Sequence, residues 1–240
     1  MNIRKKITTK EMTSKTLIFG GAGSGKTTLM LLALKDKIKL GEGITFIDGR
    51  ADKVVVSDIK KLAIEADRLE DFVYYDYSNK DNKIDFKNII IDNKILVISI
   101  PLTKLSISSA ITKSTNVLND ILKYAMNNKN INKHTFLFDT FGYSITNKIE
   151  NLLTILSQNN SLIMSIDILD KLEETPNQLN SKLINYFDTI IFLKLTDAKT
   201  AQLAMNLSTY DNDIKNIPSF NNLASFKLGE GIALSNLIQD

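Results

Sequence analysis

The glycine-rich stretch Gly20-Gly-Ala-Gly-Ser-Gly-Lys-Thr-Thr28 constrains this chain more than any other segment. Gly20, Gly25, Lys26 and Thr27 stand at the positions that the pattern G-x-x-x-x-G-K-[ST] requires. A short apolar run precedes the stretch, as in a strand, and a run typical of a helix follows it. Strand, glycine loop and helix in this order form the context in which the pattern binds phosphate. The stretch therefore predicts a P-loop (Walker A motif) rather than a glycine-rich turn that binds nothing.

The predicted ligand of this loop is ATP with Mg²⁺. The glycines let the backbone turn so that several N–H groups point at a phosphate, and the following helix directs its positive end to the same place. Lys26 would reach the β- and γ-phosphates, and the Thr27 hydroxyl would hold Mg²⁺. The predicted nucleotide-binding residues are Gly21, Ala22, Gly23, Ser24, Gly25, Lys26, Thr27 and Thr28.

Length and composition narrow the class of protein. The 240 residues allow one large domain, so we expect a polar lead-in over residues 1–15 and a single P-loop NTPase domain over residues 16–240. The chain has no cysteine, which excludes disulfides and thiolate metal sites and fits a cytoplasmic location. It has neither a signal peptide pattern nor an apolar run of membrane-spanning length. The net charge of +3 gives DNA binding no support.

Apolar runs that alternate with helical periodicity predict an α/β fold with a mostly parallel sheet, helices on both faces and a C-terminal β-hairpin. The hairpin is expected to join residues 224–228 to 232–237 around the turn at 229–231. The other predicted strands are 16–20, 44–47, 72–75, 95–100, 135–139, 161–166 and 189–193. The predicted helices are 26–39, 54–68, 106–128, 146–158, 177–186 and 197–207, with a short helical turn near 85–90.

A second nucleotide-binding element is predicted at Phe136-Leu-Phe-Asp139. In P-loop NTPases an acid at the end of a buried strand lies near Mg²⁺, and Asp139 emerges at such an end. Asp48, which also ends an apolar strand, is the alternative. Many ATPases place a glutamate directly after this aspartate, where it polarises the attacking water. Here that position is Thr140, whose hydroxyl can orient a water but cannot accept a proton at neutral pH.

Taken in order, several stretches resemble the coupling-protein ATPases of type IV secretion and conjugation. These are the TraD/TraG and IcmO-like branch of the FtsK/HerA superfamily. Beside the P-loop, the matching stretches are Phe46-Ile-Asp-Gly-Arg-Ala-Asp52, Ala66–Phe72, Asn93–Pro101, Phe136-Leu-Phe-Asp-Thr-Phe-Gly-Tyr143 and, more weakly, Leu162–Ser165, Ile190–Leu195 and Leu228–Leu234. The resemblance covers most of the chain from residue 16 onward. It implies a RecA-like motor domain that works as a homo-oligomeric ring and translocates DNA or hands over secreted substrates.

The chain departs from this family in ways that concern hydrolysis. We expect a minimal core that lacks the family's transmembrane segment and all-helical insertion. The family's acidic residue is Thr140 here, and its sensor glutamine is replaced by Asp167. Relatives carry an arginine in the helix before the strand at 161–166, whereas here that region reads Ser157-Gln-Asn-Asn160, and no arginine follows Arg68. An arginine finger raises rates by about 10³ to 10⁵, so these losses predict weak or absent ATPase activity.

Other residues allow more than one interpretation. His134, the single histidine, is expected to have a capping or surface role rather than to bind metal. Tyr75 and Tyr77 are expected to pack in the core rather than to stack on bases. Arg50 either contacts phosphate or pairs with an acid such as Asp52. Lysines could replace the missing arginines, and Asp167 or Asp48 could act as a substitute acid.

Three functions follow from these observations. The first is a nucleotide-binding protein with the catalytic candidates Asp139, Thr140 and Asp167, which binds ATP and Mg²⁺ through Thr27 and Asp139 and associates with a secretion or DNA-transfer machine. The second is an active ring ATPase that moves DNA or protein. The third is a scaffold without enzymatic activity that retains the P-loop as a relic.

Overall fold

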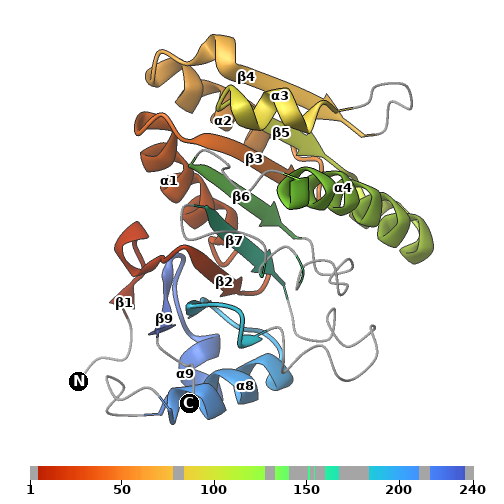
Figure 1. Ribbon diagram of the computed structural model, residues 1–240. Coiled ribbons are helices and arrows are strands. Elements are labelled where there is room, and N and C mark those ends of the chain that lie inside the picture. Colours follow the sequence, from red (N-terminus) through yellow and green to blue (C-terminus); the bar gives the residue numbers. More distant parts are fainter. Residues whose placement is uncertain are drawn as a thin grey trace.

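The computed structural model describes residues 5–77, 84–127, 133–140, 151, 154, 160–167, 184–210 and 217–235. Within these residues, nine strands form one sheet in the order β1-β9-β8-β2-β7-β6-β3-β5-β4. Figure 1 shows β4 at the top and β5, β3, β6, β7 and β2 below it in turn, with β9 and β1 at the lower left. The strands are β1 (Lys5–Lys6), β2 (Lys15–Phe19), β3 (Gly43–Asp48), β4 (Phe72–Asp76), β5 (Ile95–Ser99), β6 (His134–Asp139), β7 (Ser161–Ile166), β8 (Thr189–Phe192) and β9 (Glu230–Ser235). All pairings from β8 to β4 are parallel, whereas β9 runs antiparallel to β8 and to β1.

Helices cover both faces of this sheet. The helices are α1 (Lys26–Lys39), α2 (Lys53–Glu65), α3 (Phe86–Ile91), α4 (Ile107–Asn127), α8 (Ala198–Ser208) and α9 (Phe220–Ala224), with 3-10 turns η1 (Thr9–Glu11), η2 (Leu69–Asp71) and η3 (Leu102–Lys104). Buried residues of α1 and α2 form one core with one face of the strands. Buried residues of α3, α4, α8 and α9 form a second core on the opposite face.

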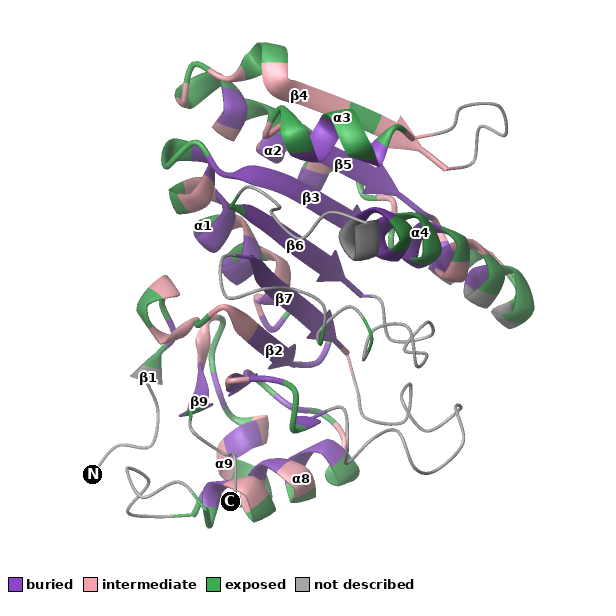
Figure 2. Ribbon diagram, viewed as in Figure 1, coloured by how far each residue is buried: buried purple, intermediate pink, exposed green. Residues whose placement is uncertain are grey.

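The apolar runs of the sequence explain why the sheet is buried on both sides. In β2, Leu17 and Phe19 belong to one core and Ile18 to the other, because successive side chains of a strand point to opposite faces. The same alternation holds in β5. Figure 2 shows the central strands buried along their whole length, which is typical of a parallel sheet covered by helices.

The predicted α/β fold with a mostly parallel sheet is confirmed, and the P-loop helix has the predicted bounds. The predicted helix over 54–68 ends earlier, at Glu65, because Asp67 adopts a positive φ of 54°. The predicted helices at 146–158 and 177–186 lie almost entirely outside the described residues. Tyr75 and Tyr77 pack against the core as predicted, with ring centroids 5.9 Å apart.

The antiparallel pairing near the C-terminus is present, but its partner is not the predicted one. Strand β9 pairs with β8 and β1, and not with residues 224–228. That segment is the end of α9 followed by a turn, since a capping box at Ser219 and Asn222 starts a helix there. The predicted polar lead-in contributes β1, and Ile7 is buried.

His134 is fully buried, so the predicted surface position is wrong. It stands opposite Gly43 in the pairing of β6 with β3. A side chain at Gly43 would collide with the imidazole, so the missing Cβ provides the space that the ring fills. The imidazole Nε2 of His134 lies 2.9 Å from Thr45 Oγ1. The backbone N–H of His134 donates to Asn160 Oδ1 at 3.0 Å.

Candidate phosphate-binding site

The glycine loop between β2 and α1 has the geometry of an open helix start. Gly25 is the N-cap of α1 with a φ of 99°, and Gly23 has a φ of 70°, both in the region that favours glycine. No side chain caps α1, so its first N–H groups are left for another acceptor. Ala22, Gly23 and Thr28 are exposed, and the loop is therefore accessible to a ligand.

Lys26 folds back over this loop and is almost completely buried. Its ammonium donates to the carbonyl of Gly20 at 2.6 Å and to that of Gly21 at 3.0 Å. It also forms an ion pair with Asp167, with Nζ 2.9 Å from Oδ1. The carboxylate of Asp167 is the more open partner, because 22% of its side chain is exposed against 2% of that of Lys26. The structure therefore brings two predicted site residues into direct contact.

Thr27 and Asp139 meet across the sheet. The Thr27 hydroxyl donates to Asp139 Oδ2 at 2.6 Å, although 112 residues separate the two in sequence. Ser165 on β7 donates to the other carboxylate oxygen of Asp139 and accepts the Thr140 N–H at 3.0 Å. A hydroxyl and a carboxylate side by side are the hard oxygen ligands that Mg²⁺ prefers, so this pair fits the predicted metal.

Thr140 follows β6 in a strained conformation. Its φ is 57°, which is unusual for a β-branched residue. Its carbonyl and that of Asp139 approach Gly49 so closely that an added Cβ would lie 2.5 Å from the Thr140 oxygen and 3.0 Å from the Asp139 oxygen. The Gly49 N–H donates to the Asp139 carbonyl at 2.9 Å. The absence of a side chain at Gly49 lets the ends of β3 and β6 close on each other.

Arg50 directs its guanidinium into the site. Its Nε donates to Thr140 Oγ1 at 2.9 Å, one of its terminal nitrogens lies 3.4 Å from Thr27 Oγ1, and the same nitrogen is 3.9 Å from Asp139 Oδ1. The alternative of a side-chain pair with Asp52 is not what the structure shows. The arginine instead places a positive charge beside the predicted metal ligands.

Asp48 does not share this arrangement. Its two carboxylate oxygens accept the backbone N–H groups of Arg50 at 2.9 Å and Asp52 at 2.5 Å, which fixes the turn after β3. Burial raises the pKa of Asp48, the two N–H groups lower it, and the charge of nearby Asp139 raises it further. Asp48 therefore shapes the turn that carries Arg50, and Asp139 is the acid that contacts Thr27.

Three features of the site did not come from the sequence. Ser165 binds Asp139, and its signal is a polar residue within the otherwise apolar run of β7. The turn before β9 packs on the P-loop, where the Gly229 N–H donates to the Ser24 carbonyl at 3.3 Å. A Cβ at Gly25 would lie 3.1 Å from Leu228 Cδ1. This long-range packing has no local sequence signal.

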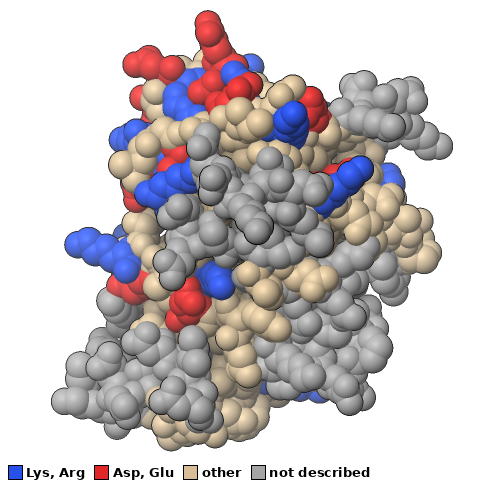
Figure 3. Space-filling model, viewed as in Figure 1, with Lys and Arg blue, Asp and Glu red and all other residues tan. Residues whose placement is uncertain are grey.

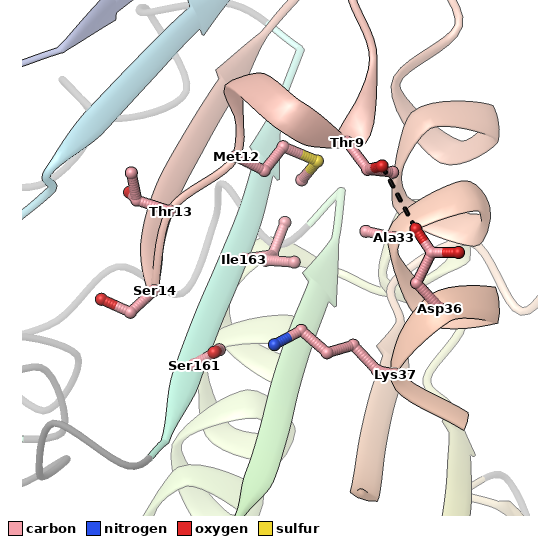
Figure 4. A pocket seen from close by; sticks show the side chains of 9 residues that line it. All are labelled: Thr9, Met12, Thr13, Ser14, Ala33, Asp36, Lys37, Ser161 and Ile163. Carbon is pink, nitrogen blue, oxygen red and sulfur yellow. Dashed lines mark hydrogen bonds between the residues drawn. The ribbon is translucent and has the colours of Figure 1, made fainter. Parts of the chain in front are cut away.

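A cavity of about 280 Å³ lies at the opposite end of the sheet, where β7 begins. Figure 4 shows it between residues 9–14, the second half of α1 and β7, with Thr9 bonded to Asp36 at 3.2 Å. Lys37 also lines it and pairs with buried Glu42, Nζ to Oε2 3.3 Å. No residue of the glycine loop lines this cavity, so it is separate from the candidate site.

Charge and hydropathy add little to this picture. On the face shown in Figure 3, the described acidic and basic side chains are interspersed and form no patch of a single sign. Among the described residues, no group of three or more His, Cys, Asp or Glu side chains is placed to hold a metal. None of the described helices is both long and apolar enough to cross a membrane.

No family model and no curated protein matches this chain, but solved structures do. VirB4 of Thermoanaerobacter pseudethanolicus aligns with 93% of this chain and 87% of its own, at a TM-score of 0.69 and 11% identity. The bacterial conjugative coupling protein TrwB aligns with 92% and 82%, at a TM-score of 0.64 and 8% identity. The genome packaging NTPase B204 from Sulfolobus turreted icosahedral virus 2, in complex with AMP, aligns with 93% and 94%, at a TM-score of 0.56 and 12% identity.

These structures confirm the α/β, RecA-like P-loop NTPase fold that was expected from the sequence.

Proposed function

We propose that this chain binds ATP together with Mg²⁺, hydrolyses it slowly or not at all, and acts by nucleotide-dependent assembly. The observation that carries the proposal is the contact of Thr27 with Asp139 at 2.6 Å beside an uncapped, glycine-started α1. Two structures with the same fold contain nucleotides: TrwB was solved with ADP and Mg²⁺, and B204 with AMP.

In this proposal each group of the site has a separate task. The N–H groups of residues 21–28 would hold phosphate oxygens, and Lys26 would neutralise their charge. Thr27 would hold the metal directly and Asp139 through a water. Bound Mg²⁺ would neutralise charge on the β- and γ-phosphates.

The position after Asp139 supports slow hydrolysis. Thr140 offers a hydroxyl where many relatives place a glutamate, and that hydroxyl accepts a hydrogen bond from Arg50. A hydroxyl cannot take the proton of an attacking water at neutral pH. Among the described residues, Arg50 is the arginine that reaches this position, so it would supply positive charge without a general base.

Binding and turnover of Mg·ATP, measured side by side, test the proposal. We expect the unaltered chain to bind Mg·ATP in calorimetry and to release phosphate at a negligible rate. Lys26→Ala is expected to weaken binding by about 100-fold, since it removes charge-assisted bonds to two phosphates. Lys35→Ala is the matched control: Lys35 lies on the same helix and pairs with Glu65 at the surface, 3.1 Å away.

Turnover separates the three functions. Thr140→Glu would restore a general base and is expected to raise phosphate release by about 10²-fold. Brisk turnover in the unaltered chain would instead favour an active motor, and no nucleotide binding would favour a scaffold. Sedimentation with and without Mg·ATP tests the assembly step, where we expect a larger species with nucleotide.

A further inference from the structure

Asp167 directly follows β7 and lies against the glycine loop. Strand β7 pairs with β2 up to Ile166 opposite Phe19, and the Gly20 N–H donates to the Ile166 carbonyl at 3.2 Å. The next residue, Asp167, therefore lies beside the start of the loop. Its carboxylate reaches the Lys26 ammonium at 2.9 Å. Of all the acidic side chains in the described residues, this is the one paired with Lys26.

The ammonium of Lys26 has no donor left for a phosphate. An ammonium carries three N–H groups, and the carbonyls of Gly20 and Gly21 together with Asp167 accept from all three. A phosphate that binds Lys26 must displace one of these acceptors. Asp167 is the one that is a side chain and partly exposed, so it is the acceptor that can leave without unfolding the loop.

The carboxylate affects a triphosphate more than a diphosphate. In a P-loop the backbone N–H groups cradle the α- and β-phosphates, and the lysine reaches on to the β- and γ-phosphates. The γ-phosphate of a bound triphosphate would come next to the position that Asp167 now holds. The γ-phosphate and the Asp167 carboxylate are both negative, and like charges side by side repel strongly in a partly buried site.

We propose that Asp167 is a specificity-determining residue that makes this site favour a nucleoside diphosphate over a triphosphate by competing with the γ-phosphate for Lys26. The inference rests on the proposed nucleotide-binding function. Both nucleotides bring a β-phosphate to Lys26, but only a triphosphate brings a γ-phosphate to the position of Asp167, so the charge of Asp167 weakens triphosphate binding more.

The test compares Mg·ADP with Mg·AMPPCP, a triphosphate analogue, by calorimetry on the full chain. In Asp167→Asn, which keeps the shape and removes the charge, we expect AMPPCP to bind about tenfold more tightly and ADP to change by less than about twofold. Asp167→Gln should act in the same direction. Asp36→Asn is the matched control: it removes the same charge from α1, ten residues and roughly 15 Å from Lys26, and should change neither affinity.

Each other outcome overturns the inference. An unchanged ratio of the two affinities in both variants would show that Asp167 does not discriminate, while the proposed nucleotide binding would stand. Weaker AMPPCP binding in the variants would show that the carboxylate serves the triphosphate state. No binding of either nucleotide by any of the chains would overturn the proposed function and this inference together. Circular dichroism of each variant checks that it is folded.

Discussion

The two ends of the parallel sheet both bury charged side chains, and they satisfy them with different kinds of partner. At the carboxyl ends, Lys26 and Arg50 bind loop carbonyls, hydroxyls and the carboxylates of Asp139 and Asp167. The carbonyls belong to the glycine loop, and Asp139, Thr140 and Asp167 lie where β6 and β7 end, with Thr140 at a positive φ of 57°. A ligand can replace such partners by a small movement of a loop or a side chain.

At the amino ends the partners belong to the framework itself. Arg68 donates to the backbone carbonyls of Ile38, Glu42 and Asn93, and its Nε bonds Asp71 at 2.9 Å. These carbonyls end α1 and flank β3 and β5, so the guanidinium ties three segments together. Exchange of these partners would require local unfolding. The comparison indicates that a buried charge belongs to a ligand site when a ligand can replace its partners, and that burial of the charge alone is not enough.

The Glu42 carboxylate shows the same framework character. It is buried, and it accepts from Lys37 at 3.3 Å, Lys133 at 3.0 Å and Thr135 at 3.1 Å. Two of its partners lie on α1 and β6, which the core already holds in place. Glu42 therefore joins helix to sheet at the end away from the phosphate site.

Among the substitutions compared at neutral pH, the largest loss of stability is expected from Arg68→Ala. The substitution removes charge-assisted hydrogen bonds from three carbonyls and from Asp71, although the Ile38 carbonyl keeps the Gly41 N–H and Asp71 keeps Lys94, each at 3.0 Å. We expect the free energy of unfolding to fall by about 3 kcal/mol. Urea denaturation measures the loss. Arg68→Lys keeps the positive charge but loses the planar guanidinium, so its free energy of unfolding should lie between those of the unaltered chain and Arg68→Ala. Nucleotide affinity of the folded variant should not change; a large change would break the distinction between the two ends.

His134 predicts a dependence of stability on pH. Burial lowers the pKa of His134 to about 3, against about 6.5 when unfolded. The unfolded chain therefore binds a proton that the folded chain does not, so this contribution is complete above pH 6.5 and is lost as the pH falls towards 3. We expect a slope of about 1.4 kcal/mol per pH unit in this window from His134 alone.

His134→Gln removes the titrating group and is the control for that slope. Denaturation curves at several pH values, for both chains, isolate the histidine as the difference between them. If the two chains lose stability in parallel below pH 6.5, the imidazole is protonated in the folded state and the amino end is less rigid than its contacts indicate.

Much of the fold could be predicted, because its signals are local. Apolar runs of five or six residues marked the buried strands β2, β3, β5, β6 and β7, and the glycine pattern fixed the start of α1. The pairing of β9 could not be predicted. The sequence of the turn at Gly229 does not distinguish a strand that pairs with residues 224–228 from one that pairs with β8, as β9 does.

The candidate site divides in the same way. Residues of the glycine loop follow from spacing, and Asp139 follows from its place at the end of an apolar strand. The partners of these residues depend on strand order, which places β7 between β2 and β6. That order brings Ser165 to Asp139 and Asp167 to Lys26, and no local pattern in the sequence encodes either contact.

Thr140→Asn tests the backbone strain at the carboxyl ends of the strands, where a ligand could replace the partners of the charged groups. Threonine at a φ of 57° is disfavoured, whereas asparagine tolerates this region and its side-chain oxygen can still accept from Arg50. We expect the free energy of unfolding to rise by about 1 kcal/mol in urea denaturation. Thr140→Ala is the control, because it loses the hydroxyl and keeps the strain; stabilisation by alanine as well would place the cost in the hydroxyl contacts and not in the backbone.

The smallest effect on stability is expected from Lys26→Met, although the same change should abolish tight nucleotide binding. Methionine fills the apolar path of the lysine stem, and Asp167 is exposed enough for water to replace the lost ammonium. Of the two loop carbonyls that Lys26 binds, that of Gly21 keeps the Ser24 N–H at 3.2 Å. We therefore expect the free energy of unfolding to fall by about 0.5 kcal/mol, less than for Arg68, which binds three carbonyls and a carboxylate. Urea denaturation without nucleotide measures it. A loss of several kcal/mol would mean that Lys26 stabilises the fold as Arg68 does, and that the partners of Lys26 are not free to be exchanged for phosphate.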